Sequence, residues 1–80
     1  MSLDKARNLA IYFAWLALAK AGQGRYGRAW VYVRKMRAPI ASLQDETATA
    51  LLREVEMTFH RKDHRRCRAS LAALAAYLVG

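Results

Sequence analysis

The sequence LAIYFAWLALAKAGQGRY, residues 9–26, predicts a long helix followed by a tight turn. Apolar side chains lie on nearly every side of this helix, and such a helix must be buried on more than one side. We therefore expect residues 3–21 to form the central helix of the fold, begun by Ser2 as N-cap. Gly22-Gln23-Gly24 ends it, because glycine past a helix end adopts the left-handed conformation of a C-cap.

Two further helices are indicated by apolar side chains at helical spacing. The first spans residues 25–36, and Pro39 beyond it makes Ala38 a natural boundary, because the residue before proline avoids helical dihedral angles. The next begins near Ser42, where Ser42 and Asp45 have the spacing of a capping box. Its apolar stripe consists of Ala48, Leu51, Leu52, Val55 and Phe59.

That stripe cannot continue beyond Phe59, because it would bury Lys62, Asp63 and Arg66. We expect a turn at residues 61–63 and a last helix capped by Asp63. The alternative is one long helix over residues 42–78. The last helix has its own stripe, formed by Cys67, Leu71, Leu74 and Leu78. The fold class is therefore all-α: residues 1–80 form a single helical domain of three to four short helices, arranged as two antiparallel helical hairpins.

The first pair of helices resembles the hairpin of the tetratricopeptide-repeat family. The family pattern is an aromatic, a leucine and a small residue in the first helix, then Gly-x-Tyr-x-x-Ala in the second. This sequence fits it with Phe13, Leu16, Ala17, Gly24, Tyr26 and Ala29. It departs from the pattern at Lys20, where the family has tyrosine, and at Pro39, which comes early. The resemblance implies a protein–protein interaction module without catalytic activity.

Charge and cysteine content indicate the class of partner and the cellular compartment that suit the chain. Its net charge of +8 favours acidic partners: nucleic acid, an anionic membrane surface or an acidic protein face. The single cysteine excludes an internal disulfide and fits a reducing cytoplasm, where we expect the protein to act. The longest apolar run, residues 9–19, is shorter than the roughly 20 residues of a membrane-spanning helix. A cleaved leader ending near residues 17–19 is an alternative that the sequence leaves open.

Side chains that could carry chemistry are few. On a continuous helix His60, His64 and Cys67 would share one face, but cationic neighbours and the lack of a fourth ligand argue against zinc. We expect Cys67 to lie inert in the core. The sequence has no paired-carboxylate site, no nucleophile–histidine–carboxylate arrangement and no phosphate loop. It predicts no enzyme, no cofactor and no metal.

Basic side chains are concentrated in residues 25–37 and 61–68. If the two hairpin turns lie on the same edge of the fold, these basic side chains form one rim. Such a rim either binds nucleic acid or is simply a solvated face. The predicted basic rim comprises Arg25, Arg61, Lys62, Arg65, Arg66 and Arg68, with Arg28 beside it. Nucleic-acid binding is the alternative function, with Tyr26 and Tyr32 as aromatic rings that could stack on bases.

The first hypothesis is a small adaptor, chaperone or inhibitor that binds a larger protein, for example one with an acidic surface. Aromatic and arginine side chains are the usual anchors of such interfaces. The predicted partner-binding residues are Tyr12, Trp15, Arg28, Tyr32, Arg34 and Tyr77. A homodimer is compatible with this, its seam drawn from Ile11, Trp15 and Leu18. Membrane-surface binding through the last helix is the third and weakest hypothesis.

Overall fold

The structure is a computed structural model that describes residues 2–80, and within them every regular element is a helix. This confirms the predicted all-α fold. Five helical segments follow one another along the chain: α1 (Leu3–Gly22), α2 (Tyr26–Lys35), α3 (Arg37–Leu43), α4 (Glu46–His60) and α5 (His64–Val79).

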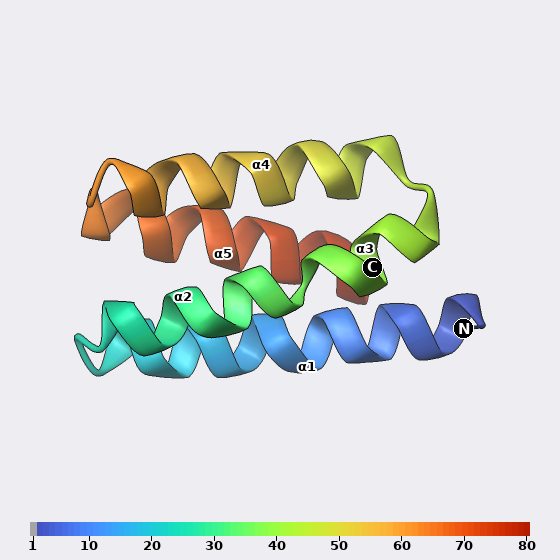
Figure 1. The fold of residues 1–80 in the computed structure, drawn as a ribbon, viewed down its shortest axis with the longest axis horizontal. Helices are drawn as coiled ribbons and strands as arrows, with labels where there is room; N and C mark the ends of the chain where they lie inside the picture. Colours follow the sequence, from blue (N-terminus) through green and yellow to red (C-terminus); the bar gives the residue numbers. More distant parts are fainter. Residues whose placement is uncertain (1) are drawn as a thin grey trace.

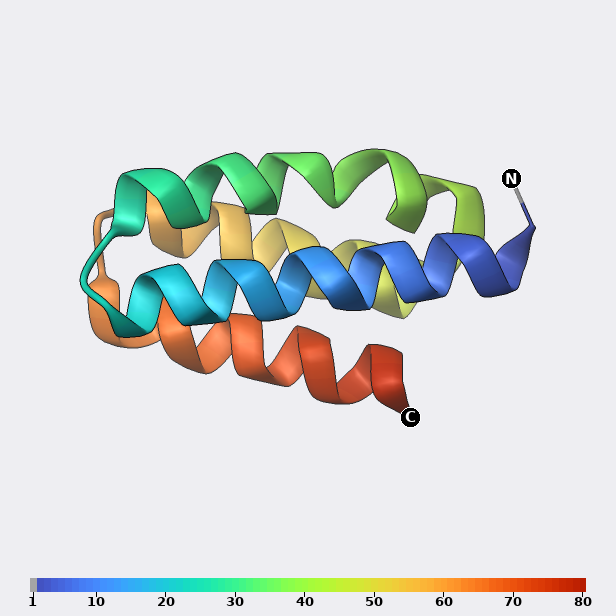
Figure 2. The same ribbon diagram turned by 90° about the horizontal axis from the view of Figure 1, so that it is seen from below.

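The segments form two antiparallel hairpins, α1/α2 and α4/α5, which α3 connects (Figure 1). α2 and α3 follow one another in nearly the same direction, separated only at Met36, so together they fill the place of one interrupted helix (Figure 2). α1 packs against α2, α3 and α5. It is therefore the central helix that its apolar sequence predicts. None of the helices in residues 2–80 has the length and apolar character needed to cross a bilayer.

The buried face of α1 consists of alanine. Five alanines at spacings of three and four residues are fully or almost fully buried: Ala6, Ala10, Ala14, Ala17 and Ala21. Larger side chains lie beside this stripe, with Phe13 toward α2 and Leu18 toward α5, and both are only half-buried. Because alanine is small, the axes of neighbouring helices can lie close to α1, and its aromatic residues are displaced toward the surface.

The second hairpin supplies the large core side chains. Leu71, Leu74 and Leu78 of α5 are buried, as is Cys67, in agreement with the predicted stripe. The α4 stripe is confirmed in its centre at Ala48, Leu52 and Val55, whereas its flanking members are half-buried. Met36 and Ile40 from the α2/α3 segment complete this core.

The turn between α4 and α5 lies where the sequence predicts it. Asp63 caps α5: its Oδ1 accepts a hydrogen bond from the backbone N–H of Arg66 at 3.2 Å. Lys62 adopts φ +54°, the left-handed conformation that reverses the chain and that glycine often provides. The alternative of one continuous helix over residues 42–78 is therefore wrong.

Two sequence-based boundaries require correction. Ala38 does not end a helix, because Pro39 lies in the first turn of α3, where a missing N–H costs no hydrogen bond. Ser42 does not cap the next helix; its hydroxyl donates to the Ala38 carbonyl oxygen at 3.2 Å. Asp45 is itself the N-cap of α4 and accepts from the Ala48 N–H at 3.1 Å. Gln44, at φ +51°, makes the intervening turn.

Candidate functional site

The turns of the two hairpins meet at the same end of the molecule (Figures 1 and 2). Tyr26, at the start of α2, stacks on His64, at the start of α5, with 3.7 Å between ring centroids and 6° between ring planes. This contact joins the two basic segments of the sequence. The structure thus brings together the turns on which the predicted rim was placed.

The basic side chains at this end are exposed to solvent. Within residues 2–80, the rim has one ion pair, between Arg66 and Asp63, whose nitrogen and oxygen lie 3.5 Å apart. The exposed members are Arg25, Arg28, Arg61, Lys62, Arg65, Arg66 and Arg68. Arg68 lies one turn further along α5 than the others. The remaining cations carry charge that no acidic side chain in the described residues pairs with.

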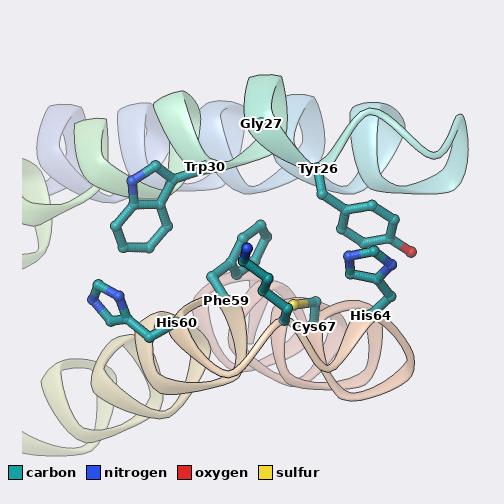
Figure 3. A pocket seen from close by; sticks show the side chains of 8 residues that line it. Tyr26, Gly27, Trp30, Phe59, His60, His64 and Cys67 are labelled. Carbon is teal, nitrogen blue, oxygen red and sulfur yellow. The ribbon is translucent and has the colours of Figure 1, made fainter.

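A cleft of about 350 Å³ opens between the two hairpins at this end (Figure 3). Trp30 meets His60 edge to face, with ring centroids 5.1 Å apart, and Tyr26 and His64 form the second aromatic pair. Phe59 lies between the pairs and within 5.6 Å of Trp30, centroid to centroid. The lining residues are Tyr26, Gly27, Trp30, Phe59, His60, Lys62, His64 and Cys67.

The two histidines of this cleft each contact an aromatic ring of α2. No group of three or more histidine, cysteine, aspartate or glutamate side chains in residues 2–80 is arranged to hold a metal ion. Cys67 is 1% exposed, and burial raises the pKa of its thiol. The thiol is therefore protonated at neutral pH and unsuited to act as a nucleophile or ligand.

A second surface lies between α1 and α5, which run side by side and antiparallel (Figure 2). A groove of about 420 Å³ separates their outer faces, and all its side chains are apolar. It is lined by Trp15, Leu18, Ala72, Ala75, Ala76, Val79 and Gly80. Trp15 is 56% exposed and Val79 is 62% exposed. Residues 8–19 of α1 and 69–79 of α5 contain no charged side chain, although the chain carries a net charge of +8.

The predicted partner-binding residues are distributed over several places. Tyr12 and Trp15 are exposed on α1, and Arg28 and Arg34 are exposed on α2. Tyr32 instead stacks on Phe13 across the α1/α2 seam, with centroids 6.4 Å apart.

Tyr77 is 42% exposed, but its hydroxyl donates to both carboxylate oxygens of Asp45, at 2.8 and 3.0 Å. This hydrogen bond ties α5 to the start of α4, so Tyr77 has a structural role whether or not it binds a partner. It also raises the pKa of the phenol.

Sequence reasoning missed two sets of residues at these surfaces. Phe59 belongs to the predicted apolar stripe of its helix, and Trp30 is one of the apolar side chains whose spacing indicates the helix over residues 25–36, yet both are only half-buried and line the cleft. Ala72 and Ala76 form part of the groove, and the signal that could have found them is the uncharged stretch after Arg68. In so short a helix, exposed alanines without charged neighbours indicate a surface that is not simply solvated.

Comparison with known proteins gives no relative: no family model matches the chain, and no curated protein or solved structure matches it.

Proposed function

We propose that this chain is a small, non-catalytic protein–protein interaction module, an adaptor, chaperone or inhibitor, that holds an amphipathic helix of a larger protein in the α1/α5 groove. The observation that carries the proposal is the uncharged, exposed surface formed by Trp15, Leu18, Ala72, Ala76 and Val79. A strongly charged chain has ample polar side chains to cover its surface, and an apolar patch of this kind usually binds another macromolecule.

The shape of the groove favours a helix as its occupant. Ala72 and Ala76 are one turn apart on α5 and project little, whereas Trp15 of α1 is a large ring beside them. Small residues allow close approach of another backbone, and the aromatic ring provides an anchor of the kind that dominates interface energetics. An amphipathic helix would place its apolar side chains in the groove at spacings of three and four residues.

The charge at one end of the groove favours an acidic flank on the partner helix. Arg65 and Arg68 stand one to two turns before Ala72 on α5, and both are exposed. The last turn of α1 lies at the same end (Figure 2), whereas the groove itself is lined by apolar side chains. A partner whose apolar face is followed by glutamate or aspartate would complement both parts. The resemblance of the first hairpin to the tetratricopeptide-repeat family likewise implies a protein–protein interaction module.

A tagged-protein pull-down tests this proposal when a groove variant is paired with a matched control. Ala76→Glu introduces a charge into the groove, whereas Ala73→Glu adds the same charge to an exposed position of the same helix outside it. We expect the unsubstituted chain and Ala73→Glu to recover one protein near stoichiometrically, with or without nuclease, and Ala76→Glu to lose it. Retention of the partner by Ala76→Glu, with unchanged circular dichroism, would overturn the groove as the binding surface.

A second copy of the chain is the competing occupant of the groove. Ile11 and Leu18 of the seam suggested by the sequence are half-buried in the monomer, so Trp15 is its main exposed member. Light scattering of the unsubstituted chain and of Ala76→Glu separates the two. A dimer that Ala76→Glu converts to monomer would show that the groove holds a second copy instead of a different protein.

A further inference from the structure

We propose that the cleft between the hairpins binds a nucleotide, with its base against the rings of Trp30 and Phe59 and its phosphate at the basic rim. This site is separate from the α1/α5 groove and does not depend on the function proposed for it. The two sites share no lining residue.

The first argument is the aromatic lining. Five of the lining side chains are rings, and they come from α2, α4 and α5. The Tyr26–His64 and Trp30–His60 pairs stand on either side of Phe59, so each ring is held in place by another (Figure 3). Rings fixed in this way offer flat apolar surfaces on which a planar ligand can stack without further ordering of the protein.

The second argument is the open space at Gly27. Gly27 lies in α2 between Tyr26 and Trp30, and a Cβ atom added there would meet no other atom within 4 Å. Gly27 is also one of the residues that line the cleft, so the cleft has no side chain at this position of α2. A cleft of about 350 Å³ has the size of a small-molecule pocket and is large enough for a base.

The third argument is the electrostatic environment. No aspartate or glutamate lines the cleft, whereas Lys62 does. Residues 25–28 and 61–66, which include four of the lining residues, hold six lysine or arginine side chains and one aspartate. That aspartate, Asp63, caps α5 and pairs with Arg66, so it does little to offset the remaining charge.

Together these features select the chemistry of the ligand. A phosphate alone would make no use of the rings, and a neutral aromatic compound would make no use of the cations. A nucleotide has both a planar base and a phosphate group, and base stacking on aromatic rings is the recurrent solution for binding single strands. The rim extends along both turns, further than one phosphate needs, so a nucleotide within a single strand fits better than a free one.

The experiment must separate the cleft from general attraction to a cationic protein, because a net charge of +8 draws any polyanion. The probe is a fluorescein-labelled single-stranded oligodeoxythymidine of about ten nucleotides, a length within the usual range of such sites. Binding is followed by fluorescence anisotropy at several salt concentrations, with adenosine monophosphate as unlabelled competitor.

Gly27→Leu is the decisive variant, since it adds a large side chain at a lining position of the cleft, keeps every charge and replaces glycine by a better helix former. Loss of one stacked base lowers affinity by about tenfold. We expect that loss for Gly27→Leu. Lys62→Ala removes a charge at the cleft, and Arg53→Ala removes the same charge from the exposed face of α4, elsewhere in the fold. We expect Lys62→Ala to weaken binding more than Arg53→Ala.

Three results decide the proposal. Wild-type affinity in Gly27→Leu, with helical content unchanged, would show that the rim binds the backbone alone and would overturn the cleft site. If neither the oligonucleotide nor adenosine monophosphate binds the unsubstituted chain, the proposal is overturned as well. If adenosine monophosphate itself binds and Gly27→Leu abolishes this, the site stands and its ligand is the free nucleotide.

Discussion

In the first hairpin, most alanines of α1 face the core and Tyr12 and Trp15 face solvent, whereas in the second hairpin the leucines of α5 face the core and its alanines, apart from Ala75, face solvent. Ala14 and Ala17 are fully buried while Tyr12 and Trp15 are more than half exposed. On α5, Leu71 and Leu74 are fully buried. The exposed alanines of α5 are Ala69, Ala72, Ala73 and Ala76.

The difference shows how one short chain makes both a core and a binding surface. Alanines on α1 let three helices approach it, and the leucines of α5 fill the remaining interior. On the exposed faces the side-chain sizes are reversed: α1 has the large ring of Trp15, which lies beside the small residues of α5. A groove follows directly from this inversion of side-chain size across the α1/α5 pair.

The largest expected effect comes from replacing a buried alanine of α1 by a large side chain. Ala14→Leu adds a larger side chain at a fully buried position in the cluster shared by α1, α2 and α5. Overpacking of a core costs about 1–3 kcal/mol, and occasionally more. For a domain of this size the whole free energy of unfolding is on the order of 4–12 kcal/mol. We expect a fall in stability of about 2 kcal/mol in urea denaturation followed by circular dichroism.

Ala19→Leu is the matched control, because Ala19 is exposed on the same helix. The same substitution there should change stability by less than about 0.5 kcal/mol. Equal losses for the two variants would mean that the two faces of α1 do not differ in packing, and the comparison of the hairpins would fail.

The turns of the hairpins were both predicted from sequence, but by different signals. Gly24 marks the first turn and has φ +76°. The second contains no glycine, and it was placed only because the apolar stripe stops at Phe59 and charged residues follow. Lys62 takes the left-handed conformation there because Asp63 caps α5 and Cys67 returns to the core. Tertiary packing therefore imposes a left-handed conformation that a lysine does not prefer locally.

Other features could not be predicted because they depend on neighbours distant in sequence. Pro39 is a helix breaker by local rules, yet the chain re-enters a helix at Arg37 and places Pro39 within its first turn. Trp30 and Phe59 have helical spacing typical of a core. Both are partly exposed at the cleft because of how α2 and α4 are placed relative to each other. The spacing of apolar residues within either helix does not predict that placement. The rim could be predicted, since it requires only that both turns lie at one end.

A smaller effect is expected from exchanging the residue types of the two turns. Gly24→Ala places a Cβ atom at a positive φ and should lower the free energy of unfolding by about 1 kcal/mol. Lys62→Gly removes the same strain but frees the unfolded chain, so a gain of less than about 1 kcal/mol is expected. Thermal and urea unfolding of the two variants measure both changes.

The opposite signs of these changes are the informative result. If Lys62→Gly destabilised the protein, contacts of the lysine side chain would outweigh its backbone strain. The second turn would then be held by its side chain and not merely tolerated by the surrounding packing.

The smallest expected effect concerns the hydrogen bond that closes the second hairpin onto the start of α4. The N–H of Ala48, and then the Tyr77 hydroxyl, lower the pKa of Asp45 from its ordinary value of 3.8. The same hydrogen bond raises the pKa of Tyr77 from its ordinary value of 10.0. A lowered carboxyl pKa stabilises the fold above pH 3.8, and this is lost as pH falls through the folded pKa. A raised phenol pKa stabilises it below pH 10.0, and this is lost as pH rises through the folded pKa.

Tyr77→Phe should therefore be less stable than the unsubstituted chain at neutral pH, and the difference should shrink at both ends of the pH scale. Urea unfolding at a series of pH values measures it. Part of the acid dependence persists in Tyr77→Phe, because the Ala48 N–H still favours the ionised carboxylate of Asp45. Tyr12→Phe is the control, since the Tyr12 hydroxyl has no hydrogen-bond partner in residues 2–80 and should give no acid-dependent difference. A difference for Tyr77→Phe that stayed constant into acid would mean that the hydroxyl does not act through the ionised carboxylate of Asp45, and this contact would not link the hairpin to α4 in the way described.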